Sequence, residues 1–129
     1  MKFFPYFYRV TIDKVLDGDT VDAVFDLGFC ISHKVRVRLA GYDAPETYRP
    51  VNEAERLAGY LCRDKLAKML KTYSGDLYCR STKIDLYGRS TGIFYCKEPL
   101  GEYCELNWLM GRFITENHYT KKELRNESD

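Results

Sequence analysis

The feature that most constrains the fold is a change in the spacing of apolar residues near Pro50. Before this point, three segments alternate apolar and polar residues: 6–15, 20–26 and about 32–40. Alternation with a period of two is typical of strands that bury one face. Asp17-Gly18, between the first two segments, is a tight-turn signal. The first 40 residues therefore predict three strands that follow one another as a meander.

After Pro50 the apolar period lengthens to that of a helix. The residues predicted to form its buried stripe are Ala54, Leu57, Ala58, Leu61, Cys62, Leu66, Met69 and Leu70. Asn52 with Glu55 three residues later is a capping box, which marks a helix start. Ser74-Gly75 is a typical helix end. The pattern predicts one long helix over about 53–73.

The rest of the chain predicts two more strands and a short helix. Strands are expected at 77–82 and 90–96, separated by a Tyr87-Gly88 turn. A short helix is expected over about 103–110, ended by Gly111 and anchored in the core by Trp108. We expect one domain over residues 1–115, followed by a polar tail or short helix over 116–129.

This order of elements favours an α+β fold that is mainly β. Three meandering strands, a helix and two further strands fit a five-stranded Greek-key barrel of the OB type, with the long helix capping one end and one or two short C-terminal helices. A doubly wound α/β sheet fits less well, because only one long helix separates any of the strands.

Composition limits the kinds of partner and compartment. The formal net charge of the 129-residue chain is only +1, so any electropositive surface must be local. The five cysteines include no C-x-x-C pair, which favours reduced, mostly buried thiols over a zinc site or a disulfide framework. The N-terminal apolar run is short and broken by Pro5, so it is not a convincing signal peptide. We expect a cytoplasmic protein with no membrane association and no obligate protein partner.

Charged residues that carry chemistry gather where the predicted strands end. The segments are Val15-Leu-Asp-Gly-Asp-Thr-Val21, Arg38-Leu-Ala-Gly-Tyr-Asp-Ala-Pro-Glu-Thr47 and Asp85-Leu-Tyr-Gly-Arg89. Among their side chains are the three carboxylates of Asp19, Asp43 and Glu46 and the two arginines Arg38 and Arg89. Carboxylates suit a hard cation, and guanidinium groups can grip the oxygens of a phosphodiester. The combination indicates metal-assisted cleavage of nucleic acid.

In order and approximate spacing, these three segments resemble the staphylococcal nuclease (thermonuclease) family over about residues 6–115. The most specific element is an arginine followed by aspartate five residues later and then by Pro-Glu-Thr. The resemblance implies a Ca²⁺-dependent endonuclease that hydrolyses DNA, or both DNA and RNA, with little sequence specificity. It also implies that the 5′-oxygen leaves and that the products carry a 3′-phosphate.

The resemblance implies a role for each motif residue. Asp19 and Asp43 correspond to the metal-binding carboxylates, and the carbonyl of Ala44 to a further Ca²⁺ ligand. Glu46 corresponds to the candidate general base. Arg38 and Arg89 correspond to the arginines that hold the scissile phosphate, and Tyr87 to a tyrosine near the nucleotide phosphate or sugar.

The motif residues also have simpler interpretations. Asp19 and Asp43 could be turn-forming aspartates that bond their own backbone, and Tyr87 could serve packing. Asp17 and Asp85 are expected to shape their turns.

The chain departs from the family's pattern at several points. Ala44 stands where the family often has threonine, the segment after Thr47 is shorter, and the C-terminal region is too short for the full last helix. Tyr119 is the candidate for the family's base-stacking tyrosines. The alternative function is a non-catalytic OB-type module that binds nucleic acid or protein, and a third is an OB-fold protein of unrelated function.

Overall fold

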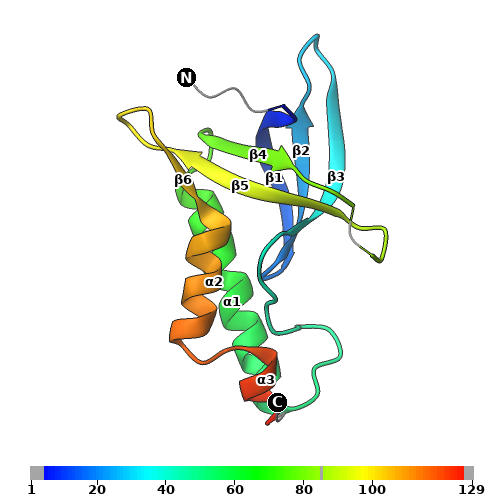
Figure 1. Cartoon of the computed structure of the whole chain (residues 1–129), viewed down its shortest axis with the longest axis vertical. Helices are drawn as coiled ribbons and strands as arrows, with labels where there is room; N and C mark the ends of the chain where they lie inside the picture. The colour runs from blue at the N-terminus through cyan, green and yellow to red at the C-terminus, as the bar shows by residue number, and fades with distance from the viewer. Residues whose placement is uncertain (1–4, 85, 127–129) are drawn as a thin grey trace.

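The computed structural model describes residues 5–84 and 86–126, so that the motif residue Asp85 lies outside the described residues. Within these residues the strands curl into a barrel at one end of the molecule, and the helices lie beneath it (Figure 1). The elements in chain order are β1 (Phe7–Asp17), β2 (Thr20–Asp26), β3 (Ser32–Leu39), α1 (Glu53–Thr72), β4 (Leu77–Ser81), β5 (Ser90–Lys97), β6 (Tyr103–Glu105), α2 (Leu106–Glu116) and α3 (Lys121–Leu124).

The sheet closes on itself, which confirms the predicted α+β barrel of the OB type. Its strand order is β3-β2-β1-β4-β5-β6, with antiparallel neighbours throughout. A parallel pairing of β3 with β5 joins the ends of the five-stranded barrel, and β6 extends β5. Closure removes open sheet edges, and it brings the end of β3 beside the start of β5.

The alternation in the three N-terminal segments does mark the core face. Along β2, Val21, Ala23 and Phe25 are buried, and along β3, Val37 and Leu39 are buried. The intervening residues, among them Arg36 and Arg38, therefore project from the outer face of the barrel. This placement puts the arginine of the motif outside the core but next to the β1–β2 turn, because Arg38 pairs with Thr20.

The long helix forms where predicted, but the face that it buries differs in part from the predicted stripe. Asn52 caps it, since its side chain accepts a hydrogen bond from the Glu55 amide at 2.8 Å. Leu57 and Leu61, predicted to be buried, are 52% and 50% exposed. Ala54 is exposed as well. Ala58, Cys62, Leu66 and Leu70 are buried as predicted, and Glu55 and Gly59 are buried in addition. Among the described residues, no helix combines the length and the apolar content needed to cross a lipid bilayer.

A buried ion pair explains why Glu55 lies on the buried face of α1. The Arg125 guanidinium donates two hydrogen bonds to the Glu55 carboxylate, at 2.8 and 3.1 Å, and Glu55 is fully buried. Burial alone would raise the pKa of Glu55, but the bonds from Arg125 and from the Val51 amide hold it below its usual value. The Asn52 side chain also donates to the Leu124 carbonyl at 2.8 Å. The short helix α3 is therefore docked on the start of α1 (Figure 1).

The expected short helix over 103–110 is wrong in its bounds. Residues Tyr103–Glu105 form β6, because Cys104 pairs with Cys96 of β5. Helix α2 begins only at Leu106 and continues through Gly111 to Glu116. Trp108 is not a core anchor, since it is 57% exposed and points away from the buried face of α2. That face instead presents Leu106, Asn107, Met110 and Ile114.

We predict that the Glu55–Arg125 pair contributes measurably to stability. Arg125→Ala would leave a buried carboxylate without its cation and should lower the free energy of unfolding by about 2–4 kcal/mol. Arg112→Ala, which removes an exposed ion pair to Glu116 on α2, is the control and should change it by at most about 0.5 kcal/mol. Urea denaturation of both variants measures the difference. Equal stability of the two variants would contradict the structural role of Arg125.

Candidate functional site

The site is built where two loops pack closely on helix α1. One is the β1–β2 turn with Gly18, and the other is the segment after β3 that contains Ala44 and Glu46. A Cβ on Gly18 would lie 2.8 Å from the Cβ of Cys62 and 2.9 Å from that of Ala44. A Cβ on Gly59 would lie 2.7 Å from the Glu46 carbonyl oxygen. Small residues are therefore required on both sides of this contact, which fixes the loops relative to each other.

Hydrogen bonds join the same two loops directly. The Thr47 amide donates to the Asp17 carboxylate at 3.2 Å, across 30 residues of sequence. The Tyr42 hydroxyl donates to the Gly18 carbonyl at 2.6 Å. Burial raises the pKa of Tyr42 well above its ordinary value, so the hydroxyl keeps the proton that it donates. Asp17, expected only to shape its own turn, thus also ties the turn to the Pro-Glu-Thr segment.

Asp19 is a desolvated carboxylate in a fixed orientation. The residue is only 8% exposed. One carboxylate oxygen accepts a bond from the Ala44 amide at 2.9 Å, and the other accepts one from the Thr20 hydroxyl at 2.9 Å. Burial raises the pKa of Asp19, and the hydrogen bonds and the charge of Arg38 only partly offset this effect. Additional positive charge nearby would therefore stabilise the ionised form of Asp19.

Arg38 lies between the two candidate metal-binding carboxylates. Its Nη2 atom is 3.5 Å from Asp19 Oδ2 and also contacts Asp43 Oδ1. The same guanidinium donates to the Leu39 carbonyl at 3.1 Å and to the Tyr42 carbonyl at 2.9 Å. The Arg38 side chain is 14% exposed, whereas that of Asp43 is 69% exposed. Two carboxylates, one buried and one open to solvent, thus converge on one positive group.

This arrangement fits the donor set expected for a hard cation. Asp19 and Asp43 present oxygen ligands within reach of the same point, which the guanidinium of Arg38 contacts in this structure. Ala44 is buried, and its amide is bonded to Asp19, so this segment is held against the β1–β2 turn. Carboxylate, carbonyl and water oxygens suit Ca²⁺. A cation here would share the carboxylates with Arg38 and release part of the guanidinium for an anionic ligand.

Glu46 lies on the same segment but has a different partner. Its Oε1 atom is 3.3 Å from the Nζ atom of Lys121 on α3. The Glu46 side chain is 46% exposed and that of Lys121 is 27% exposed, so the pair borders solvent. Nothing in the sequence indicates a role for Lys121. No local pattern could reveal it, since it stands 75 residues after Glu46 in a tail of ordinary polar composition.

Arg89 and Tyr87 lie on the β4–β5 loop, which projects from the barrel (Figure 1). The Arg89 guanidinium carbon lies 5.2 Å from the centre of the Tyr87 ring, and Tyr87 is 83% exposed. Arg89 immediately precedes Ser90, which pairs with Val37, the neighbour of Arg38. The loop is thus anchored beside the end of β3, with a cation and an aromatic ring on its exposed surface.

The structure therefore groups the predicted residues in three sets. It brings Asp19, Arg38, Asp43 and the Ala44 amide into direct contact. It places Glu46 on the same segment, paired with Lys121. It places Arg89 and Tyr87 together on the neighbouring loop. Tyr119, the candidate stacking residue, instead packs edge-on against Phe113 and the hydrophobic core.

No family model matches the chain, and no curated protein sequence matches it. The resemblance to the nuclease family thus depends on the three motif segments. What the structure adds is the direct contact among Asp19, Arg38 and Asp43, whose carboxylates and guanidinium are drawn from two of those segments.

We predict opposite effects for two equivalent substitutions in helix interiors. Gly59→Ala should lower the free energy of unfolding by about 1–3 kcal/mol, because the new methyl group meets the Glu46 carbonyl. Gly111→Ala is the matched control, since its methyl group would lie at an ordinary 3.6 Å from the Tyr42 Cβ. It should raise stability by about 0.5–1 kcal/mol through helix propensity. Thermal and urea denaturation test both, and a neutral Gly59→Ala would contradict the close packing.

We also predict that the Asp19 carboxyl group titrates above the ordinary range in the metal-free protein. Because folding raises this pKa, the folded state binds the proton more tightly than the unfolded state does. The contribution of Asp19 to stability therefore falls as pH rises from the pKa of the unfolded chain through that of the folded chain. Added Ca²⁺ should lower the pKa of Asp19, since a cation favours the charged form. Carboxyl-carbon NMR titration with and without Ca²⁺ measures both effects. A titration curve of Asp19 that Ca²⁺ leaves unchanged would remove it from the ligand set.

Proposed function

We propose that this chain is a Ca²⁺-dependent nuclease that hydrolyses phosphodiester bonds in DNA, or in both DNA and RNA, with little sequence specificity. The single observation that carries the proposal is the convergence of Asp19 and Asp43 on Arg38. Metal-assisted phosphodiester hydrolysis can use carboxylates to hold the ion, a guanidinium to bind the phosphate and a further carboxylate as general base. They come from the same motif segments that resemble the staphylococcal nuclease family.

The arginines would bind the scissile phosphate and stabilise charge in the transition state. A guanidinium stays charged at any physiological pH and can bond two phosphate oxygens at once. Arg38 is presented at the edge of the barrel by β3, and Arg89 by the adjoining β4–β5 loop. A bound Ca²⁺ ion would supply the charge that neutralises Asp19 and Asp43 and polarises the phosphate. Arg38 would then be available to the substrate.

Glu46 would accept the proton of the attacking water. A half-exposed carboxylate on a fixed backbone can hold a water molecule by a hydrogen bond and take its proton as the bond to phosphorus forms. Lys121 would restrict the rotamers of Glu46 through their ion pair. The 5′-oxygen leaves, and the 3′-phosphate product follows from the family resemblance.

A groove beside the carboxylates offers a path for the nucleic-acid strand. It has a volume of about 810 Å³ and extends from Asp43 past Trp108 to Lys121 and Lys122. The Arg112 guanidinium lies 5.3 Å from the centre of the exposed Trp108 ring. Exposed aromatic rings stack on bases, and neighbouring cations attract the backbone phosphates. The groove itself is lined by as many acidic as basic side chains, Asp43, Glu105 and Glu116 against Arg112, Lys121 and Lys122. Attraction of the substrate would therefore depend on Arg38, Arg89 and the bound cation.

We predict cleavage of plasmid and single-stranded DNA in Ca²⁺ and its loss in excess chelator. Arg38→Ala, Arg89→Ala and Glu46→Gln should each lower turnover at least about tenfold, since each removes a transition-state interaction. Arg36→Ala is the control for Arg38: it lies on the same outer face of β3 but is bonded to Asp22, at 2.9 and 3.2 Å. Its activity should stay near that of the parent protein, and circular dichroism verifies that all variants fold.

Two results of this assay would count against the proposal. Cleavage that chelator does not affect would remove the metal requirement. Oligonucleotide that is bound under every divalent ion yet never cut would instead identify a non-catalytic OB-type binding module. The second outcome has a structural rationale, because both Arg38 and Glu46 are already ion-paired within the protein.

A further inference from the structure

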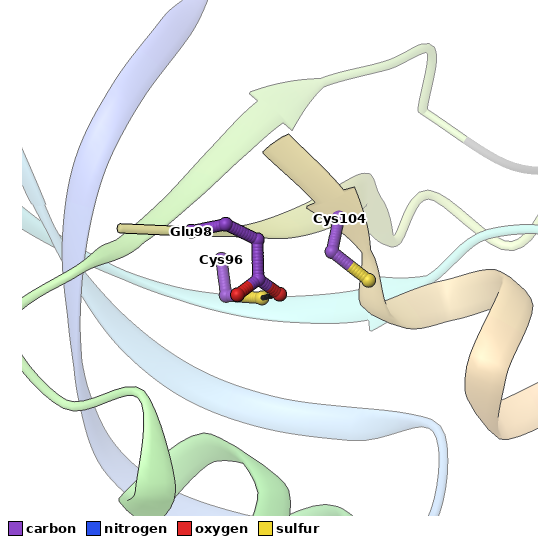
Figure 2. Close-up of side chains that lie close together, drawn as sticks. All are labelled: Cys96, Glu98 and Cys104. Carbon is purple, nitrogen blue, oxygen red and sulfur yellow. Dashed lines mark hydrogen bonds between the residues drawn. The ribbon is translucent and has the colours of Figure 1, made fainter. Parts of the chain in front are cut away.

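Three potential metal ligands meet at the β5–β6 hairpin. The Cys96 thiol, the Glu98 carboxylate and the Cys104 thiol each place a ligand atom within 4.8 Å of the other two. Figure 2 shows the Glu98 carboxylate beside the Cys96 sulfur, with the Cys104 side chain next to them on the facing strand. Sequence alone argues against zinc, since the five cysteines are odd in number and include no C-x-x-C pair. Here two ligands come from paired strands, and the third, Glu98, comes from the turn that follows β5.

The hairpin geometry determines this cluster. Cys96 and Cys104 are direct partners in the antiparallel ladder of β5 and β6, so their side chains project from the same face. Glu98 lies just beyond the end of β5, and its carboxylate projects toward the same two sulfur atoms (Figure 2). The turn is closed by a bond from the Glu98 amide to the Glu102 carbonyl at 2.7 Å, and by one from the Gly101 amide to the Glu98 carbonyl at 2.8 Å. The three ligands are thus attached to a hydrogen-bonded frame.

The donor atoms suit a borderline-soft ion. Zinc binds thiolate sulfur at about 2.3 Å and carboxylate oxygen at about 2.0–2.2 Å, so the ligand atoms of a tetrahedral ion are roughly 3.5–3.8 Å apart. The Cys96 sulfur is 3.8 Å from Glu98 Oε1, which is already near that separation. Small rotamer changes would bring the Cys104 sulfur to the same centre. Two sulfur atoms make Ca²⁺ or Mg²⁺ unsuitable here.

We propose that Cys96, Glu98 and Cys104 form a zinc-binding site, separate from the candidate nuclease site, with a water molecule as the fourth ligand. Cys96 supplies a buried ligand, and the half-buried Cys104 and Glu98 leave an entry path for the ion. Bound zinc would cross-link β5 to β6, and β6 continues directly into α2. The ion would therefore stabilise the junction between the barrel and its C-terminal helices.

Zinc binding by two thiols should depend on pH, because each thiol must lose its proton to the solvent when the ion binds. Burial, together with the neighbouring Cys104 and Glu98, raises the pKa of Cys96 to about 11. Tyr73, at the end of α1, also faces this thiol, and its own pKa is raised by Cys96. Zinc must displace the thiol proton to bind, so its affinity should increase as pH rises. For comparison, burial also raises the pKa values of the Cys62 and Cys79 thiols, to about 12, and neither residue belongs to the proposed site.

Cobalt and zinc titrations of the full chain, reduced with a non-chelating phosphine, test the site. We expect one Co²⁺ per chain, with the ultraviolet absorption of a thiolate–cobalt bond, displaced by Zn²⁺ and tighter at pH 8 than at pH 6. Zinc should also raise the melting temperature. Cys104→Ser should abolish the absorption and Glu98→Gln should weaken binding at least about tenfold, since each removes a ligand. Cys30→Ser, which changes an exposed thiol, should bind normally.

Other outcomes would overturn the proposal. Reduced protein that shows no thiolate–cobalt absorption has no such site. Equal binding by Cys104→Ser and the parent chain would place the metal elsewhere, as would a Cys30→Ser variant that loses it. Asp43→Ala separates this proposal from the nuclease: it should retain zinc binding even where Ca²⁺-dependent cleavage is lost or was never present.

Discussion

The close contact between two loops and helix α1 is the constraint on which the candidate site depends. Gly18 and Gly59 have no side chain, and this absence lets the β1–β2 turn and the Ala44–Glu46 segment reach the same helix surface. The contact then needs only short hydrogen bonds, such as that of Tyr42 to Gly18, to become rigid. Rigid positioning matters because carboxylates can share a cation only when their oxygens are held within a few tenths of an ångström.

The charged groups of the candidate site differ in how deeply they are buried. Asp19 is desolvated and strongly bonded, Asp43 is open to solvent, and Arg38 connects them. A site of this kind, with hard oxygen ligands at the edge of the barrel, differs in chemistry from the sulfur-containing cluster on the β5–β6 hairpin. The two proposed ions would therefore not compete, since ligand softness discriminates between them.

The C-terminal segment is part of the folded unit through residue 126 rather than a loose appendage. Arg125 neutralises the buried Glu55 at the start of α1, and Lys121 pairs with Glu46. The same short helix thus supports the main helix and contacts the candidate general base. Because both interactions are electrostatic, any change that detaches α3 would alter stability and the orientation of Glu46 together.

The strands, the long helix and the barrel could be predicted because alternation, capping and turn residues are local signals; β2 occupies the predicted residues. The motif segments likewise indicated Asp19, Arg38 and Asp43. The sequence predicted the burial of Ala58, Cys62, Leu66 and Leu70 on α1, but only tertiary structure decided that Gly59 and Glu55 are buried too, because they are covered by Glu46 and Arg125. It also turned residues 103–105 into a strand, exposed Trp108, and assembled the cluster of Cys96, Glu98 and Cys104. Such features depend on which strands pair and which helices dock, and short-range periodicity does not encode that information.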